Sequence, residues 1–534
     1  MYLLLLVQYS RRTLVIARNL DEILTSSHKK IDDFGYALFT SIAVPYHSHS
    51  ENEMRLNFLG DAPRLPLLLV LMIPSASLAF STPAPSLGIL SRTLHSSSIV
   101  GPISMTTPFP TPDTLHPYRP PRWAEGKLNN IPKHGRLHLA NLPTPIHSVT
   151  RPIRATTRRQ NETSHPLTTG RMEHSLVHDA TGGVELGGNK VRKLEFLLAD
   201  AIARGCNAVV TIGGEQSNHC RATAAASRMV GLSPHLILRT ARADTIHDET
   251  EDMGWTGNVL FDRLVGSTIY TCTAGEYGRL GSNKLVQGVC DHLQFQSKAF
   301  NKPYPIPVGG SNGIGSWGYI NGVDELMNQL QSMRDSSPSF ALDHVVFATG
   351  SGGTAAGIAL GLSLAYGKLG EGHPAAEGHS SPSVHAVGVC DSPDYFYNTV
   401  AALATDMGLA IDSAAMEEFV RNSVTVHQGK GRGYAVSSNE ELDFIVQFSV
   451  ETGIALDPVY SGKALFHFLT KVVEEDPESY RNSNILFWHT GGALGIYEKG
   501  VDLADRLESV SSVKRIDIYQ TKTSSTDKVV DLSS

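Results

Sequence analysis

The sequence predicts an α/β protein built on open parallel β-sheets. From about residue 132, short apolar runs alternate with segments whose apolar residues recur at helical spacing. Two units are clear: 208–214 (AVVTIGG) leads into 217–232, and 344–350 (HVVFATG) leads into 354–367. In such units each helix returns the chain to the same edge of the sheet, so successive strands pair in parallel.

Three further apolar runs continue the alternation, at 235–240 (HLILRT), 385–390 (HAVGVC) and 484–492 (NILFWHTGG). Ser217 or Asn218 is expected to cap the helix after the first strand, because both side chains accept hydrogen bonds from free N–H groups of a first turn. Residues 368–383 are rich in Gly, Pro and Ser and predict a loop insertion.

The beginning of the chain has a different composition. Residues 64–80 (RLPLLLVLMIPSASLAF) combine a basic residue, a short apolar run and a small-residue end, as a cleavable signal does. The following stretch is rich in Ser, Thr and Pro and has no acidic residue before Asp113, which is typical of an organelle transit peptide. We therefore expect 1–125 to be a targeting leader and linker, mostly disordered, that directs the protein to a plastid or a mitochondrion.

The overall charge and the cysteines exclude several classes of protein. The formal net charge of -7 argues against nucleic acid as a partner. The sequence has no run of 18 apolar residues, so we expect no membrane span in the mature protein. The five cysteines include no CxxC pair, which indicates neither a disulfide framework nor a metal site.

A glycine turn at 187–196 (GGNKVRKLEF) places lysines at the start of a helix. A nucleotide loop, GxxxxGK[ST], is excluded because Asn189 follows Gly188 and no hydroxyl residue follows Lys190. The positive end of a helix and partial burial both disfavour a charged amine, so Lys190 is a candidate nucleophile. We expect Lys193, one turn on, to be solvated or paired with a carboxylate.

A second glycine-rich turn, 348–357 (ATGSGGTAAG), predicts an anion cup at a helix N-terminus. Its converging N–H groups and hydroxyls suit a phosphate monoester, and it lacks the lysine of a nucleoside triphosphate loop. The cup residues are Thr349, Gly350, Ser351, Gly352, Gly353 and Thr354. The first turn offers the Lys190 amine and the second a binding site for a phosphate group, called here the phosphate seat. Pyridoxal phosphate requires both, a lysine that bonds to its aldehyde and a site for its phosphate.

A third turn, 212–220 (IGGEQSNHC), begins a helix with Ser217, Asn218 and His219. Such an end can bind a substrate carboxylate. Ordinary N-capping explains the same residues, so this motif alone does not decide between the two.

Taken together, the motifs resemble the fold-type II pyridoxal-phosphate family of D-cysteine desulfhydrase and 1-aminocyclopropane-1-carboxylate (ACC) deaminase. The resemblance runs over roughly 140–498 and rests on LPTPIH, GGVELGGNKVRKLEFLLADA, TIGGEQSNHCRATA, LILRT, GNVLFDRLVG, IPVGGSN, TGSGGTAAG, LDPVYSGKA and WHTGGALGIY. It implies two open parallel-sheet domains, similar to the tryptophan synthase β fold, with the cofactor between them. The implied larger domain covers 135–192 and 308–505, the smaller substrate-closing domain covers 193–307, and 506–534 is a disordered tail.

The resemblance also implies roles for individual residues. Lys190 matches the Schiff-base lysine, Asn218 the ligand of the cofactor's phenolic oxygen, and Gly350 to Thr354 the phosphate site. Ser217 and His219 match the residues that hold the substrate carboxylate and assist proton transfer. Tyr434 and Tyr460 match two active-site tyrosines, Thr490 a cofactor contact and Ser461 a substrate contact. A homodimer that acts on a small amino acid is expected.

Two positions bear on the substrate. ACC deaminases are expected to have Glu after the DPVY tyrosine and Leu after the histidine of HxGG, whereas this chain has Ser461 and Thr490. A glutamate near the pyridine nitrogen strengthens the electron sink needed to open a cyclopropane ring, whereas a hydroxyl suffices when thiolate leaves. The resemblance therefore implies β-elimination of D-cysteine to pyruvate, ammonia and hydrogen sulfide.

Several alternatives remain open from sequence. They are ACC deaminase, which forms 2-oxobutanoate and ammonia, D-serine dehydratase, a β-replacement enzyme, and a catalytically silent protein that binds pyridoxal phosphate. The silent alternative is motivated by 150–180, which is unusually basic and polar where the family has a regular strand. In the same segment the family's charged strand end is reduced to His178 and Asp179.

Overall fold

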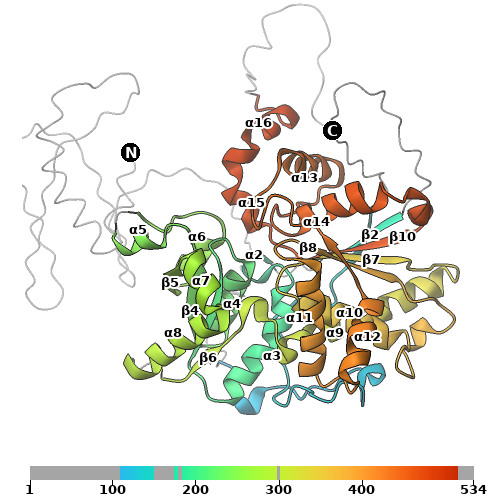
Figure 1. Ribbon diagram of the computed structural model, residues 1–534, viewed down its shortest axis with the longest axis horizontal. Coiled ribbons are helices and arrows are strands. Elements are labelled where there is room, and N and C mark those ends of the chain that lie inside the picture. Colours follow the sequence, from blue (N-terminus) through green and yellow to red (C-terminus); the bar gives the residue numbers. More distant parts are fainter. Residues whose placement is uncertain (1–108, 150–172, 179–182, 250, 297–300, 515–534) are drawn as a thin grey trace, which may run out of the picture. The chain divides into compact units, whose positions relative to one another are not determined.

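The computed structural model describes residues 109–149, 173–178, 183–249, 251–296 and 301–514 (Figure 1). The predicted α/β class is confirmed, because the described strands form two sheets in which parallel pairing dominates. Most of the expected leader (1–108), most of the atypical segment (150–172) and the last residues (515–534) lie outside the described residues.

The larger sheet has six strands in the order β1-β2-β10-β7-β8-β9. Its strands are β1 (Ile146–Val149), β2 (Glu173–His178), β7 (His344–Thr349), β8 (Ser383–Gly388), β9 (Thr425–Gln428) and β10 (Asn484–His489). All neighbours pair in parallel except β1 and β2, which are antiparallel. The antiparallel edge was not expected from the sequence, and it forms on both sides of the atypical segment 150–172.

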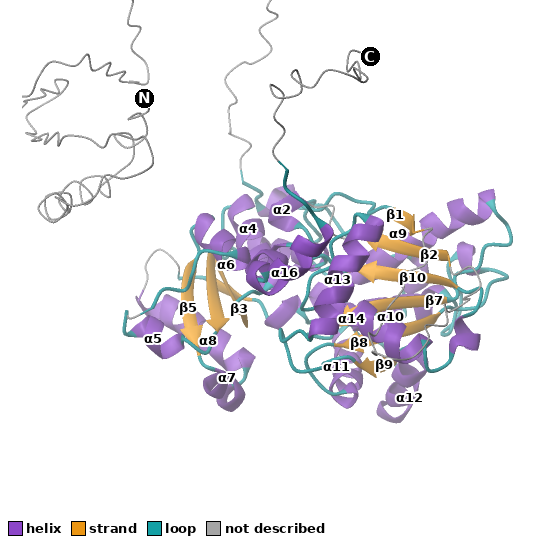
Figure 2. Cartoon of the chain, turned by 90° about the horizontal axis from the view of Figure 1, so that it is seen from above, coloured by secondary structure: helices purple, strands orange, loops and turns teal. Residues whose placement is uncertain are grey.

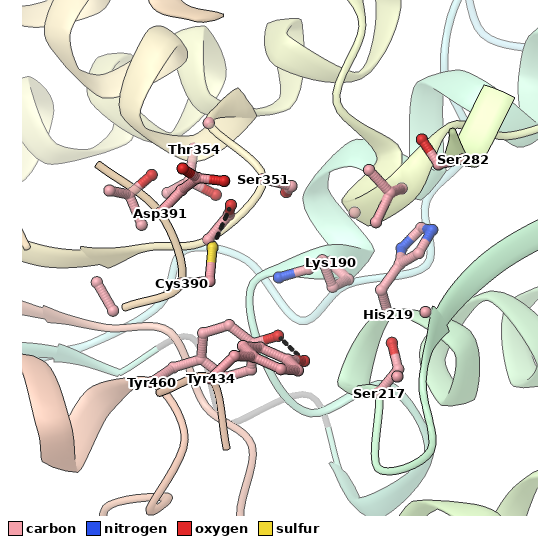
Figure 3. Close-up of a pocket in the computed structure, with 18 of the residues that line it drawn as sticks. Lys190, Ser217, His219, Ser282, Ser351, Thr354, Cys390, Asp391, Tyr434 and Tyr460 are labelled. Atoms are coloured by element: carbon pink, nitrogen blue, oxygen red, sulfur yellow. Dashed lines mark hydrogen bonds between the residues drawn. The ribbon is translucent and has the colours of Figure 1, made fainter. Parts of the chain in front are cut away.

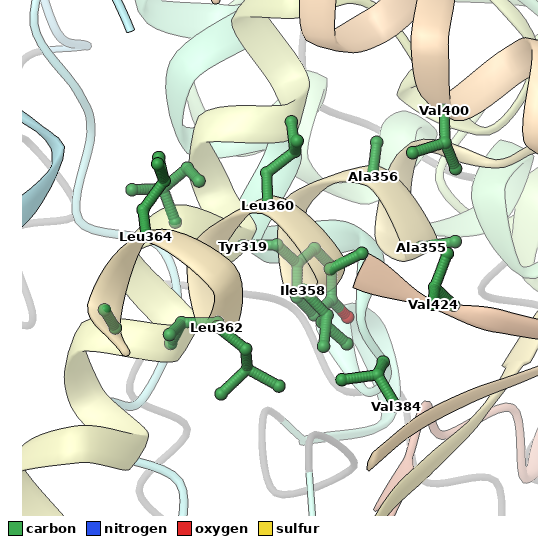
Figure 4. Packing of buried hydrophobic residues seen from close by; sticks show 14 of the residues in the cluster. Tyr319, Ala355, Ala356, Ile358, Leu360, Leu362, Leu364, Val384, Val400 and Val424 are labelled. Carbon is green, nitrogen blue, oxygen red and sulfur yellow. The ribbon is translucent and has the colours of Figure 1, made fainter. Parts of the chain in front are cut away.

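Helices bury both faces of the larger sheet (Figure 2). One face packs against α9 (Gly313–Ser336), α10 (Gly353–Ala365), α11 (Pro393–Asp406) and α12 (Ser413–Ser423), and the other against α13 (Asn439–Thr452) and α14 (Ser461–His467). Along β10, Leu486 and Trp488 pack in the core on the α9–α12 side, called here the first core. Ile485 and Phe487 pack in the second core, on the α13–α14 side. This alternation on a sheet covered on both sides explains the continuous apolar strands of the sequence. Figure 4 shows α10 within the first core.

The smaller sheet has four parallel strands in the order β5-β4-β3-β6. They are β3 (Ala208–Gly214), β4 (Ser233–Arg239), β5 (Thr268–Cys272) and β6 (Pro303–Pro305). The helices of this region are α4 (Asn218–Met229), α5 (Ala243–His247), α6 (Gly257–Leu264), α7 (Ala274–Leu280) and α8 (Ser282–Gln296). Leu236 and Leu238 pack toward α4 and α6, whereas Ile237 packs toward α8. The predicted borders of the two domains remain a prediction.

The remaining elements connect or flank the sheets. They are α2 (Gly183–Leu186), α3 (Lys190–Ala203), α15 (Leu494–Glu498), α16 (Gly500–Val510), a π-helical turn at Phe468–Val473, and 3-10 turns at Pro112–Thr114, Arg122–Ala124, Val308–Gly310, Pro374–Ala376 and Pro477–Tyr480. Within the expected linker, Trp123 is buried and its Nε1 donates to Asp324 Oδ1 at 2.9 Å. None of the described helices is long and apolar enough to cross a membrane. All five cysteines are free thiols.

A row of three histidines crosses adjacent strands of the larger sheet. His344 Nδ1 lies 3.1 Å from His385 Nε2, and His385 Nδ1 lies 3.0 Å from His427 Nε2. Burial lowers the pKa of His385 to about 3 and that of His427 to about 4, and in His385 the neighbouring histidines act in the same direction. His385 uses both ring nitrogens in the row, donating with one and accepting with the other, so this middle ring has to be neutral.

The histidine row predicts loss of stability in acid. An unfolded histidine takes up a proton near pH 6.5, whereas folded His385 does so only near pH 3, so falling pH favours unfolding between these values. In urea unfolding, the stability lost between pH 6.5 and 4.5 should be roughly 2–3 kcal/mol smaller in His385→Phe than in the wild type. His247→Phe, at an exposed position, should lose as much as the wild type. Equal losses in His385→Phe and the wild type would contradict the account.

Candidate active site

A cavity of about 410 Å³ lies at the carboxyl ends of strands from both sheets (Figure 3). Ligands of parallel α/β sheets bind at this edge, where the loops after the strands converge. Of the residues predicted from the sequence, the cavity is lined by Lys190, Ser217, His219, Thr349, Gly350, Ser351, Gly352, Thr354, Tyr434, Tyr460 and Thr490. Asn218, Gly353 and Ser461 are not among its lining residues.

Lys190 is the first residue of α3, and its amine points into the cavity (Figure 3). Its Nζ donates to Asn189 Oδ1 at 2.6 Å and lies 5.8 Å from the centre of the Tyr460 ring. Asn189 is buried, its N–H donates to the Thr490 carbonyl at 2.9 Å, and its Nδ2 donates to Thr354 Oγ1 at 2.9 Å. Asn189 therefore holds the turn at 187–190, called here the lysine turn, against both the end of β10 and the glycine-rich turn at 348–357.

The turn before Lys190 is also held from the smaller sheet. Arg221, on α4, donates from Nη1 to the Glu185 carbonyl at 2.6 Å and from Nη2 to the Gly187 carbonyl at 2.7 Å. Gly188 has φ +107°, and a Cβ there would lie 3.0 Å from the Thr490 carbonyl oxygen. A side chain at Gly188 would thus strain the backbone and crowd β10, which explains the glycine.

The glycine-rich turn connects β7 to α10. Gly352 has φ +80°, and α10 begins at Gly353, so the first N–H groups of this helix face the turn. Thr349 Oγ1 is buried and has no hydrogen-bond partner within the described part of the chain. A buried orphan hydroxyl is costly, and an anion seated in the turn would satisfy it. The turn therefore fits the predicted phosphate monoester.

Lys193 contradicts the sequence expectation. It was expected to be solvated or paired with a carboxylate, but its side chain is fully buried and donates to the Gly309 carbonyl at 3.1 Å and to Ser311 Oγ at 3.2 Å. A Cβ on Gly353 would lie 2.8 Å from Lys193 Nζ, so this amine lies directly behind the glycine-rich turn. Burial lowers the pKa of Lys193 well below its usual range, and the charge of Lys190 acts in the same direction.

Ser217 and His219 begin the helix after β3. Ser217 caps α4, because its hydroxyl accepts from the Cys220 N–H at 3.2 Å, and it also lines the cavity. His219 Nε2 lies 2.8 Å from Thr211 Oγ1, which itself donates to the Ile306 carbonyl at 2.9 Å. Burial, together with the charges of the two lysines, lowers the pKa of His219 well below its usual range, so the ring is neutral. Its predicted role as a substrate ligand stays a prediction.

The two predicted tyrosines form a hydrogen-bonded pair (Figure 3). Their hydroxyl oxygens are 2.9 Å apart, and either one can be the donor. Burial raises the pKa of both hydroxyls, so each keeps its proton near neutral pH. The pair therefore offers the cavity a proton donor.

Two predicted residues lie behind the cavity wall. Asn218 Oδ1 accepts from Asn258 Nδ2 at 3.1 Å, and a Cβ on Gly492 would lie 2.5 Å from Asn218 Nδ2. Ser461 is fully buried, and its hydroxyl donates to Asp457 Oδ1 at 2.6 Å. The roles predicted for Asn218 in cofactor binding and for Ser461 in substrate binding are not tested by this geometry.

Comparison with known proteins defines the class of enzyme. The profile of the family described as "Pyridoxal-phosphate dependent enzyme" matches residues 182–491. This match includes the lysine turn and the glycine-rich turn, and pyridoxal phosphate is the cofactor that the sequence predicted.

The family within that class follows from individual relatives. The chain is 42% identical over 412 residues to a protein of Arabidopsis thaliana named "Bifunctional D-cysteine desulfhydrase/1-aminocyclopropane-1-carboxylate deaminase, mitochondrial", covering 76% of this chain and 90% of that one. It is 29% identical to a "D-cysteine desulfhydrase" of Salmonella typhi, covering 69% of this chain and 98% of the relative. The chain belongs to the D-cysteine desulfhydrase/ACC deaminase family of pyridoxal-phosphate dependent enzymes.

A solved structure agrees with the fold. The crystal structure of an ACC deaminase homologue is 26% identical, covers 72% of this chain and 99% of that one, and superposes with a TM-score of 0.53. The predicted fold type II, with two open sheets, is thereby confirmed.

Sequence reasoning missed three polar residues of the site. Asn189 was noted only as a departure from a nucleotide loop, Lys193 was expected elsewhere, and Arg239 was not singled out although it lines the cavity. The spacing of Lys190 and Lys193 was a usable signal, because residues three apart share a helix face.

The position of Lys193 predicts separate effects on cofactor binding and stability. Lys193→Met should weaken binding of pyridoxal phosphate about tenfold or more, because the amine behind the glycine-rich turn, which can take up a proton when the phosphate binds, is lost. It should not lower the unfolding free energy of the cofactor-free protein, because a buried amine that has no carboxylate partner within the described part of the chain is costly. Equilibrium dialysis and urea unfolding measure the two quantities.

Lys463 provides the matched control. It is also fully buried, but it pairs with Glu441 at 3.2 Å and donates to the Val436 carbonyl at 2.9 Å. Lys463→Met should lower the unfolding free energy by about 3–5 kcal/mol, because Glu441 is left buried without its partner. Cofactor affinity equal to wild type in Lys193→Met would contradict the assignment.

Proposed function

We propose that the protein catalyses β-elimination of D-cysteine, in which D-cysteine and water give pyruvate, ammonia and hydrogen sulfide. The observation that carries the proposal is the arrangement of one cavity: the Lys190 amine lies between the phosphate seat, the tyrosine pair and the capped end of α4. The relatives named as D-cysteine desulfhydrases support the choice of substrate.

Several residues of this chain would hold the cofactor. Gly350 to Thr354, with Thr349, would bind its phosphate, Lys190 would bond to its aldehyde carbon, and Asn218 would meet its phenolic oxygen. Thr490 would close the cavity beside Asn189. When bound, pyridoxal phosphate supplies the electron sink that accepts the charge left on Cα after the proton is removed.

The other side chains would position the substrate and move protons. The end of α4, with Ser217 and the first N–H groups, would bind the substrate carboxylate. The base that takes the Cα proton is either the Lys190 amine or an arrangement of Ser217 and Tyr434. Tyr434 and Tyr460 would donate a proton to the departing sulfur, since both hydroxyls keep their protons at neutral pH. Acid–base catalysis of this kind contributes ~10²–10⁴ in rate.

The second candidate is ACC deamination. It is favoured by relatives named for that activity, such as a "Putative 1-aminocyclopropane-1-carboxylate deaminase" of Thermotoga maritima that is 36% identical over 318 residues. Ser461 and Thr490 argue against it, because both stand where ACC deaminases are expected to have Glu and Leu. In the structure the Ser461 hydroxyl is bonded to Asp457, so position 461 offers no acid to the cavity.

A location in a plastid or mitochondrion also remains a proposal. It is supported by the composition of 64–112 and by the A. thaliana relative, whose name includes "mitochondrial".

One assay with four substrates tests the proposed function. The protein without its leader, loaded with pyridoxal phosphate, is incubated with D-cysteine, L-cysteine, D-serine and ACC, and sulfide and keto acid are measured. We expect sulfide and pyruvate from D-cysteine at the highest kcat/KM. Sulfide from L-cysteine alone, or 2-oxobutanoate from ACC as the main product, would overturn the choice of substrate, and no product from any substrate would favour the silent alternative.

Lys190→Ala provides the control for covalent binding. The variant should lose the visible absorbance band of the bound cofactor and all lyase activity, because the amine that bonds to the cofactor is removed. A variant that retains both would show that another lysine, such as Lys193, carries the cofactor.

A further inference from the structure

Arg239 is a cation of the cavity that the proposed reaction leaves without a role. It is the last residue of β4 and lines the cavity at the carboxyl end of that strand. Its guanidinium carbon lies 4.8 Å from the centre of the Tyr277 ring and 5.5 Å from the centre of the Tyr434 ring. Two aromatic rings, from α7 and from the loop after β9, thus contact one guanidinium.

No carboxylate of the described residues neutralises the charge of Arg239. Among the described residues, no carboxylate lies within ion-pair distance of it, whereas other half-buried arginines such as Arg136 and Arg242 each have one. Asp391 also lines the cavity but lies beyond ion-pair distance of Arg239. Burial raises the pKa of Cys390 to about 11 and also raises the pKa of Tyr434. The positive charge of Arg239 offsets part of both increases.

The contact between Arg239 and Tyr434 depends on a glycine in the neighbouring strand. Gly214 of β3 is the register partner of Arg239 in β4. A Cβ on Gly214 would lie 3.3 Å from Tyr434 Cε1, so the missing side chain lets the Tyr434 ring lie close to these two strand ends. The ring then contacts the guanidinium and shares a hydrogen bond of 2.9 Å with Tyr460.

The order of groups across the cavity indicates what Arg239 faces. Lys190 Nζ lies 5.8 Å from the Tyr460 ring, Tyr460 is bonded to Tyr434, and Tyr434 contacts Arg239. Arg239 therefore lines the cavity next to the tyrosine pair. In the proposed function the amino group of the substrate is at Lys190 and its carboxylate at Ser217, which leaves the side chain of the substrate to point toward the tyrosines.

We propose that Arg239 forms an anion subsite for the side chain of the amino-acid substrate. The subsite takes a negatively charged group on Cβ, or a group such as thiol that becomes negative as it leaves. The chemical class is a small D-amino acid with an anionic or ionisable β-substituent. The inference rests on the proposed function, because it places the substrate by its amino and carboxylate groups.

D-aspartate and D-asparagine test the subsite, because they share their shape and differ in the charge of the group on Cβ. Neither carries a thiol, so their binding can be followed without sulfide release. Dissociation constants come from the change in cofactor absorbance on titration, and inhibition constants from competition with D-cysteine. The wild type should bind D-aspartate about tenfold or more tightly than D-asparagine.

Variants identify the residue responsible for this preference. Arg239→Gln should weaken D-aspartate about 10- to 100-fold and change D-asparagine less than about threefold, whereas Arg239→Lys should retain part of the preference. Arg279→Gln removes the same charge from an exposed position on α7 and should leave both affinities unchanged.

The outcomes separate the subsite from the proposed function. Equal affinities in the wild type, no binding of D-aspartate to a protein that turns over D-cysteine, or equal losses for both ligands in Arg239→Gln would overturn the subsite. Equal losses would show that Arg239 binds the α-carboxylate instead. If D-cysteine releases no sulfide and neither ligand changes the absorbance, the proposed function fails, and the subsite fails with it.

Discussion

The hydrogen bonds of Asn189 are the constraint on which the rest of the site depends. Its backbone N–H donates a hydrogen bond to the Thr490 carbonyl at the end of β10, and its Nδ2 donates to the hydroxyl of Thr354. Its Oδ1 accepts a hydrogen bond from the amine of Lys190. These bonds join the turn before α3, the end of β10 and the start of α10, which are far apart in sequence. The Lys190 amine and the glycine-rich turn consequently share one cavity, and neither the turn before Lys190 nor α10 alone would produce that arrangement.

The smaller sheet contributes to the same constraint through α4. The helix that would bind the substrate carboxylate also carries Arg221, which bonds to the carbonyls of Glu185 and Gly187 just before the lysine. A change at the N-terminus of α4 is therefore coupled mechanically to the turn that positions Lys190. This coupling accounts for the buried arginine on a helix whose other buried residues are mostly small.

Much of this arrangement could be predicted from the sequence, for reasons that are local. The strand 208–214 has the predicted bounds, because an apolar β-branched run ending in glycines is determined by near neighbours. The turns at 187–189 and 350–353 could be identified because clustered glycines after an apolar run mark a tight turn. The antiparallel β1–β2 edge was not predicted, since it forms across the segment 150–172 that separates the two strands.

The charged residues of α3 show where local reasoning fails. The sequence led us to expect a solvated or carboxylate-paired Lys193, but α3 is buried on all sides from Val191 to Ile202. Its charged residues find distant partners, as when Arg192 pairs with Glu325 at 2.9 Å and Asp200 accepts from Tyr304 at 2.6 Å. Lys193 is likewise buried by a distant segment, because the turn at Val308–Gly310 and the following Ser311 cover its side chain. Periodicity cannot show what a helix meets more than a hundred residues away.

The central claim is that Lys190 and the glycine-rich turn 350–354 hold the two ends of one pyridoxal phosphate. A crystal structure of the protein grown with the cofactor tests this most directly. The account predicts continuous electron density from Lys190 Nζ to the cofactor and a phosphate group within the turn, close to the Thr349 hydroxyl. Density joined to Lys193, or a phosphate seated outside residues 349–354, would contradict it.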